Sequence, residues 1–199
     1  MLSPVSTILK IGQSLFAVSI LAGLLVALSV LGIRSTAILE PLELTVYDWL
    51  IQSQRGSAES DPRIVLIEVT EQDILRQGRW PITDAILAEA LTRLAQYQPR
   101  AIGIDIYRDI PVEPGHADLN RVFVEHPQIV IVTKLGGGVV AGIPPPPALA
   151  GTEQVAFNDI LIDSDGIVRR GLLFQEVGEQ TAYAFALRLA LLFLAEEGI

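Results

Sequence analysis

The longest apolar stretch of the chain lies near its N-terminus. From Ile11 to Ile33, 23 residues follow one another without a charged side chain. A helix rises about 1.5 Å per residue and satisfies its own backbone hydrogen bonds, so this stretch can cross a hydrocarbon core of about 30 Å. The pattern therefore predicts a transmembrane helix over residues 11–33, preceded by a cytoplasmic N-terminus over residues 1–10.

Charges on either side of this helix indicate its orientation. Lys10 and the α-amino group precede it, whereas Arg34 is soon followed by Glu40 and Glu43. Basic residues favour the cytoplasmic side of a membrane. We therefore expect a single pass through the inner (plasma) membrane, with the following domain on the extracytoplasmic side. A cleaved signal peptide, cut near residues 35–37, is the alternative, although the apolar run exceeds the usual length of about 7–15 residues.

The next part of the chain alternates between apolar runs and polar breaks. Residues 34–60 are predicted to be a connector, in which Leu42–Ile51 forms a short amphipathic helix before a polar loop. Residues 61–199 are predicted to form one domain. It begins with Arg63–Val69, a run rich in β-branched residues that is typical of a buried strand.

A helix and a second strand follow this run. Thr83 or Asp84 can cap a helix with an apolar stripe, and Pro99 limits its extent. Ala101–Ile106 then has the pattern of another buried strand, so strand, helix and strand predict a parallel βαβ unit.

The rest of the chain supplies further short elements around a long irregular loop that contains Gly136 to Gly138 and Pro144 to Pro147. The expected elements are a helix over Leu119–Glu125, strands over Gln128–Thr133, Val155–Phe157 and Gly166–Arg170, and a closing helix over Tyr183–Glu197. The predicted fold class is therefore α/β: an N-terminal transmembrane helix followed by a mixed, partly parallel sheet flanked by helices.

Composition excludes several classes of function. The formal net charge is −9, and all 23 acidic residues follow residue 35. Such a domain repels a phosphate backbone, so we expect no nucleic-acid partner. The chain has no cysteine, which excludes disulfides and thiolate metal sites. No cofactor-binding fingerprint, G-x-S-x-G elbow or H-E-x-x-H pair is present, so neither a cofactor nor an enzymatic activity of this chain is predicted.

Acidic residues stand where ligands bind in open α/β sheets, at the ends of the predicted strands. Glu71 follows the first strand, Asp105 lies near the end of the second, and Asp163 and Asp165 occupy a turn. Carboxylates that converge there could hold a hard cation. Acids in these positions more often cap helices or form turns, and the spacing fails the calcium-loop template. The structural interpretation is therefore favoured over a metal site.

Three other residue types could contact a ligand. Arg169 and Arg170 could grip an anion, or pair with the nearby aspartates; on a strand, alternation would send their side chains to opposite faces. Trp80, just before the first long helix, is expected to be a core or lid aromatic, with ligand stacking as the alternative. His116 and His126 lie in polar stretches and are interpreted as surface residues.

Taken together, these residues resemble a known family, the type 2 CHASE domain, an extracytoplasmic sensor of bacterial membrane receptors. The resemblance extends over residues 47–190. Its motifs are Tyr47–Leu50, Asp61–Ile67, Glu71, Gly78–Pro81, Ala101–Ile106 and Asp163–Arg170. The chain departs from the pattern at Thr70-Glu71, where relatives often carry Asp-Glu, and it stops at Ile199, before the second part of the domain. The resemblance thus implies an incomplete sensor domain.

The resemblance also implies a function and partners. Receptors of this kind carry further membrane helices and a cytoplasmic output module, a kinase or a nucleotide cyclase, some of them in two-component systems. We therefore expect this chain to be a sensory input domain with an unknown small-molecule or envelope stimulus, an output module in the same chain or in a partner, and a homodimeric state. Candidate ligand-binding residues are Glu71, Trp80, Asp105, Asp163, Asp165 and Arg169.

Two other functions stay open at this point. The first is a membrane-tethered, metal-dependent hydrolase that uses acids such as Asp105 and Asp163. The second is a passive envelope protein that binds a partner through an exposed strand edge.

Overall fold

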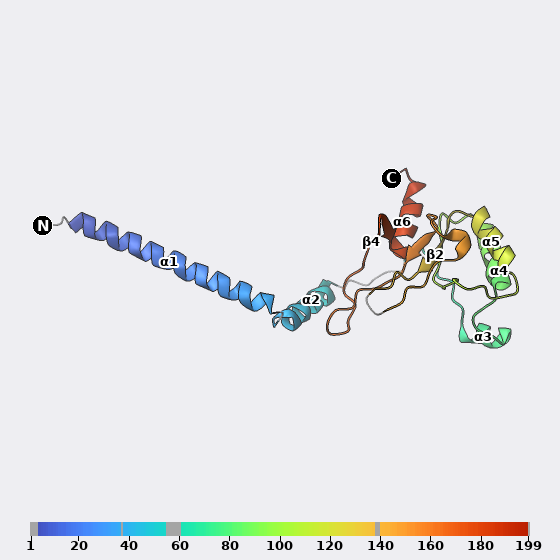
Figure 1. The fold of residues 1–199 in the computed structure, drawn as a ribbon, viewed down its shortest axis with the longest axis horizontal. Helices are drawn as coiled ribbons and strands as arrows, with labels where there is room; N and C mark the ends of the chain where they lie inside the picture. The colour runs from blue at the N-terminus through green and yellow to red at the C-terminus, as the bar shows by residue number, and fades with distance from the viewer. Residues whose placement is uncertain (1–3, 37, 55–60, 138–139, 199) are drawn as a thin grey trace. The chain divides into compact units, whose positions relative to one another are not determined.

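The computed structural model describes residues 4–36, 38–54, 61–137 and 140–198. It divides into two compact units, Met1–Val65 and Leu66–Ile199, which are considered separately (Figure 1). The predicted polar loop before residue 61 falls largely on residues 55–60, outside the described residues. Gly138 of the predicted glycine loop also lies outside them.

The described part of the first unit contains two helices. Helix α1 spans Pro4–Ser35 and contains the whole apolar run over residues 11–33. Among the described residues, this is the one helix long and apolar enough to cross a membrane, over the window Val18–Ser35, where every side chain is exposed. Helix α2 spans Glu40–Gln54 and buries none of its residues. Both predicted helices are therefore present, and α2 is longer at both ends than expected.

The second unit is built on a short parallel sheet. Its strands are β1 (Ile102–Ile104), β2 (Ile129–Thr133) and β3 (Val155–Phe157), hydrogen-bonded in the order β1-β2-β3. Every residue of β2 is buried. A continuous apolar run is what a central parallel strand requires, because helices cover both faces of such a sheet. The parallel sheet expected from the sequence is confirmed for these three strands.

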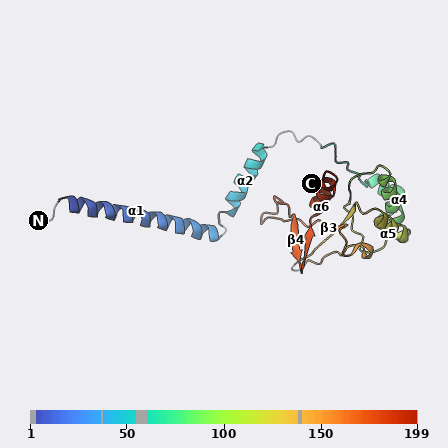
Figure 2. The same ribbon diagram turned by 90° about the horizontal axis from the view of Figure 1, so that it is seen from above.

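Helices flank this sheet. Helices α4 (Asp84–Ala95) and α5 (His116–Glu125) pack against each other, side by side in Figure 1 and Figure 2, and cover one face. Helix α6 (Phe185–Ala195) contacts all three strands. The main core joins α4 and α5 to the sheet and consists of Ile82, Leu87, Ala88, Leu91, Ile102, Ile104, Leu119, Val122, Phe123, Ile129, Ile131 and Leu149. The last of these belongs to a short 3₁₀ helix, Pro147–Leu149.

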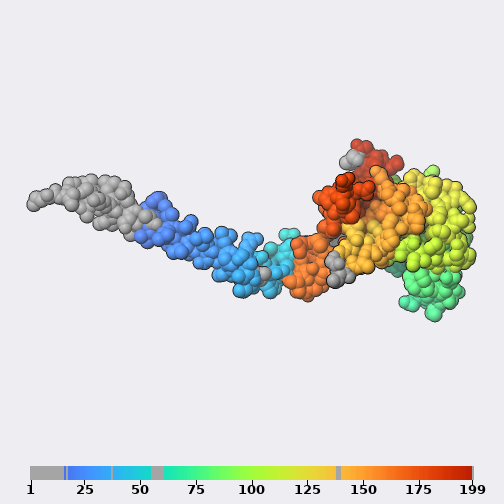
Figure 3. All heavy atoms as spheres, viewed as in Figure 1, coloured from blue at the N-terminus to red at the C-terminus, as the bar shows by residue number. Residues whose placement is uncertain are grey.

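Two small elements complete the unit. Strands β4 (Phe174–Val177) and β5 (Gln180–Tyr183) form an antiparallel hairpin that the sequence analysis missed. Helix α3 (Glu71–Gln77) begins with a capping box between Thr70 and Asp73 and ends at Gly78, whose φ is +67°. It buries none of its residues and protrudes from the second unit in Figure 3, where it is green.

Two predicted strands are absent. Residues 64–69 form an exposed segment without regular secondary structure, and Arg63 lies in a turn. Among the described residues, β1 pairs with β2 alone. Residues 166–170 form no strand: they follow a turn at residues 164–165, and within this stretch only Arg170 makes a β-bridge, to Leu161. Ion pairs of the two arginines with acids of the same turn replace the expected ladder.

Candidate functional site

The carboxyl end of β1 borders a pocket of about 320 Å³ in the second unit. It is lined by Trp80, Pro81, Asp105, Ile106, Tyr107 and Arg108. Residues 105–108 directly follow β1, and residues 80–81 precede α4. Ligands of open α/β sheets bind at the carboxyl ends of the strands. The pocket therefore lies where the sequence analysis expected a site, and it brings together two of the predicted residues, Trp80 and Asp105.

A second strand end supports one wall of this pocket. Asn158, which directly follows β3, donates from Nδ2 to Oδ1 of Asp105 at 2.9 Å. Its Oδ1 accepts a hydrogen bond from the hydroxyl of Tyr107 at 2.7 Å. The amide thus links the carboxyl ends of β1 and β3 across β2 and fixes the carboxylate that faces the pocket. Neither Asn158 nor Tyr107 was identified from the sequence.

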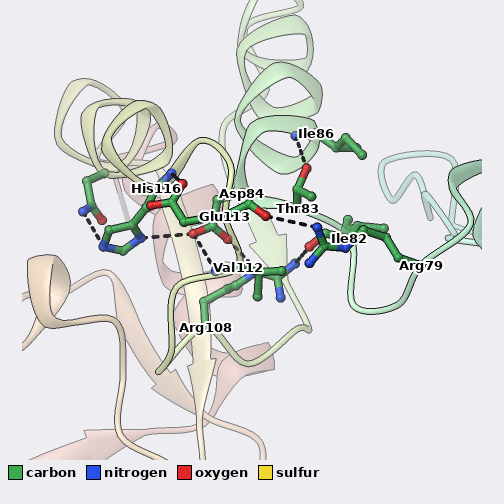
Figure 4. A network of polar contacts seen from close by, with 10 residues as sticks. Arg79, Ile82, Thr83, Asp84, Ile86, Arg108, Val112, Glu113 and His116 are labelled. Atoms are coloured by element: carbon green, nitrogen blue, oxygen red, sulfur yellow. Dashed lines mark hydrogen bonds and ion pairs between the residues drawn. The ribbon is translucent and has the colours of Figure 1, made fainter.

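Beneath the pocket, a buried arginine pairs with a buried aspartate (Figure 4). The side chains of Arg108 and Asp84 are 3% and 1% exposed, and Nε of the arginine lies 3.4 Å from Oδ1 of the carboxylate. Nη2 of Arg108 donates to the carbonyl of Ile82 at 2.7 Å. Burial lowers the pKa of the Arg108 guanidinium from its ordinary value, and the charge of Asp84 opposes that shift.

The same aspartate ties the start of α4 to the loop before α5. Its backbone N–H donates to the carbonyl of Val112 at 2.8 Å, and its Oδ2 accepts from the Val112 N–H at 3.2 Å. Nδ1 of His116 lies 3.0 Å from Oδ2 as well, and Nε2 of the same ring lies 3.1 Å from Nδ2 of Asn120. The His116 ring therefore lies between the Asp84 carboxylate and the Asn120 side-chain amide. The interpretation of His116 as a surface residue was therefore wrong.

Local sequence explains how this network is positioned. Thr83 is the N-cap of α4, and its side chain accepts a hydrogen bond from the N–H of Ile86. Of the two predicted caps, Thr83 and Asp84, the structure therefore selects Thr83. Asp84 then occupies the first turn, where helix amides lack partners within the helix. A turn containing Gly115, with φ of +108°, returns the chain so that the Pro114 carbonyl accepts the Ala85 N–H at 2.8 Å.

The predicted acids of the turn after β3 form a separate cluster. Arg169, only 5% exposed, binds Asp163 at 3.0 Å and Asp165 at 2.6 Å, and Arg170 also binds Asp163. Hydrogen bonds from Arg170 and Arg169 hold the pKa of the Asp163 carboxyl below its usual range, and Arg169 lowers the pKa of Asp165 to about 2. Both arginines reach one carboxylate, so the expected alternation to opposite faces is wrong, because residues 166–169 are not a strand.

The remaining predicted residue, Glu71, stands apart from both groups. It is the exposed first residue of α3, next to the Thr70 N-cap. In the part of the chain that the structure describes, no three His, Cys, Asp or Glu side chains are placed to hold a metal ion. Ligand binding by Glu71 and by the turn cluster stays a prediction.

The pocket combines properties that suit a small molecule. The Trp80 ring is 55% exposed at the rim. Pro81 and Ile106 add apolar surface, and Asp105 and Tyr107 add polar groups. An aromatic face beside a carboxylate favours a ligand with an apolar body and a hydrogen-bond donor or positive charge. These features make the pocket the candidate binding site.

Comparison with known proteins places this geometry in a family. The family model of the CHASE2 domain matches residues 24–199. No curated protein matches the chain, and no solved structure does. The matched range covers the later part of α1, α2 and the whole second unit.

Proposed function

The chain belongs to the CHASE2 domain family, and from this membership we propose that it is the input domain of a membrane receptor that relays an external stimulus to a kinase or nucleotide cyclase module. CHASE2 domains are extracytoplasmic sensor domains of membrane receptors. The family match over residues 24–199 carries the proposal, because it joins the apolar helix and the α/β unit in one module. The output module belongs to the same chain or to a partner.

The pocket after β1 is the proposed stimulus site. Its carboxylate is held by Asn158, and its aromatic rim is exposed. The hydrogen bond from Asn158 fixes the carboxylate, which reduces the ordering that binding costs. An envelope small molecule with an apolar body and a polar, donor-bearing end fits this lining.

Signalling requires that the stimulus bind two states unequally. A ligand in this pocket would contact residues before α4 and after β1 at once, because Trp80 and Asp105 come from different segments. Ligand binding would therefore favour one relative position of the two segments that carry Trp80 and Asp105. In the proposed mechanism, α1 transmits this change across the membrane to a homodimeric output module.

The ligand site is tested by thermal unfolding of the full chain in detergent. A fraction of envelope small molecules that contains the stimulus should raise the unfolding temperature in a saturable way, because a ligand at a hundredfold excess over Kd adds about 2.7 kcal/mol to the free energy of unfolding. Trp80→Ala and Asp105→Asn should each unfold cooperatively and lose at least tenfold in apparent affinity. As the matched control, Trp49→Phe removes the other tryptophan, in α2, and should respond like the wild type. An unchanged response of both pocket variants would place the stimulus site elsewhere.

The topology is tested with reporter fusions. Alkaline phosphatase joined after residue 60 or after residue 199 should be active, because the proposed orientation exports everything after α1. β-Galactosidase at the same positions should be inactive and should be active when joined before Pro4. The reverse pattern would contradict the extracytoplasmic placement of the domain.

A further inference from the structure

The segment Leu66–Val69 exposes apolar residues that a folded domain normally buries. Leu66 is 79% exposed and Ile67 is 63% exposed. Within the described residues, no backbone group from Leu66 to Val69 takes part in a hydrogen bond, and no regular secondary structure is formed there. The β-branched, apolar composition is that of a strand, so the segment has the sequence of a strand and lacks only a neighbour.

One edge of β1 has no neighbouring strand among the described residues. This strand pairs with β2 on one side, and the described residues place no strand on its other side. Because Ile102 donates its N–H towards β2, the peptide groups of Gly103 point to the open edge. An open edge of this kind is a template for another strand.

We propose that Leu66–Val69 docks in parallel along the free edge of β1 and adds a fourth strand to the sheet. Chain connectivity supports this occupant. Trp80 and Pro81 already border the carboxyl end of β1. A strand that runs parallel to β1 ends at that same edge, so residues 70–79, including α3, need to bridge only the rim of the sheet.

The two faces of the sheet select a register. Ile102 and Ile104 face the core beneath α4 and α5, whereas Gly103 faces Phe185 of α6. Placing Ile67 beside Ile104 puts Ile67 and Val69 on the α4 face. Leu66 then lies beside Gly103, and Glu68 lies beside Asp105 on the other face. A slip of one residue would send Glu68 into the core, which is unfavourable for a carboxylate.

Docking would also assemble the predicted ligand residues. In parallel pairing, the docked strand ends at Val69, at the carboxyl end of β1 where Asp105 and Trp80 lie. Glu71, two residues later, is then close to the pocket. The segment lies in the sequence between α2 and α3, which gives a route from the pocket towards the membrane helix. This coupling rests on the proposed sensory function, whereas the pairing itself does not.

Disulfide cross-linking tests the pairing in the full chain. The sequence has no cysteine, so introduced thiols are the only ones present. Glu68→Cys with Asp105→Cys places two exposed positions opposite each other, about 4.8 Å apart in a paired sheet and within the Cα range of a disulfide. Glu68→Cys with Glu179→Cys, in the β4–β5 turn, is the matched control.

We expect oxidation in membranes to cross-link the first pair within one chain at least tenfold faster than the control pair. Wild-type amides of Ile67 and Val69, which face β1 in this register, should also exchange with deuterium far more slowly than an unpaired chain does. Equal rates for the two pairs together with unprotected amides would overturn the proposal. Cross-links that form only between two chains would overturn it too, since the occupant would then be a second copy. No ligand is added in this experiment, so a negative result would overturn the strand pairing alone. The sensory function is tested separately, by the ligand-binding and reporter-fusion experiments.

Discussion

Replacing Asp84 by alanine should destabilise the protein by roughly 3–5 kcal/mol, the usual cost of removing one partner from a buried ion pair. The substitution leaves the Arg108 guanidinium, 3% exposed, with the Ile82 carbonyl and no carboxylate. It also takes the acceptor away from the N–H of Val112 and from Nδ1 of His116. Asp84 links the start of α4, the residues after β1 and the loop before α5. The lost free energy of unfolding therefore exceeds that of one hydrogen bond.

Thermal unfolding of the full chain in detergent measures this effect. A domain of this size loses about 2–4 °C per kcal/mol, so the unfolding temperature should fall by about 6 °C or more. Asp118→Ala is the matched control, because Asp118 lies on α5, is 60% exposed and pairs only with Arg121 in the described structure. Exposed pairs contribute about 0.2–1 kcal/mol. Equal shifts for the two variants would mean that the buried network does not stabilise the fold.

Gly115→Ala should be the second strongly destabilising change, by about 3 kcal/mol or more. Gly115 has φ of +108°, a conformation that costs an L-residue roughly 1–2 kcal/mol. An added Cβ would also lie well inside contact distance of the backbone N and Cα of Ala85. Because backbone atoms cannot rotate away, the loop must shift and weaken the hydrogen bond between Pro114 and Ala85.

Gly151→Ala separates the two causes. Gly151 also has a positive φ, of +75°, but an added Cβ there meets nothing within 4 Å. This control should lose only the conformational cost of about 1–2 kcal/mol. The difference between the unfolding temperatures of the two variants then measures the contact with Ala85. If Gly151→Ala proves as harmful as Gly115→Ala, the close approach of the two backbones contributes nothing.

Local patterns in the sequence predicted the elements that depend on neighbouring residues alone. The apolar run over residues 11–33 predicted a long helix, and α1 contains it. Thr83 predicted the start of α4, since an N-cap satisfies amides two or three residues away. The apolar run at Gln128–Thr133 predicted a strand, and β2 is buried throughout. The residues that resemble the CHASE type 2 family likewise identified the family that the chain matches.

The candidate site was predicted only in part. Asp105 follows from the rule that ligands bind at strand ends, whereas Trp80 was expected to be a core or lid aromatic with ligand stacking as the alternative; both line the pocket. Arg108 gave no comparable signal, because a lone arginine after a strand is usually exposed. Tyr107 and Asn158 are 51 residues apart in the chain, and nothing local indicates that they meet. A polar residue directly after each predicted strand was the one usable signal.

The sequence by itself determined the family and those helices, strands and caps that follow from short-range patterns, such as α1, β2 and the Thr83 cap. The tertiary structure alone decided which distant polar groups became partners: Asp84 with Arg108, and Asn158 with Asp105. It also showed that the composition of a strand does not by itself produce a ladder, since residues 64–69 make no strand pairing in the described structure. The physical reason is that periodicity reports which face of an element is apolar, whereas pairing depends on which elements the topology brings side by side.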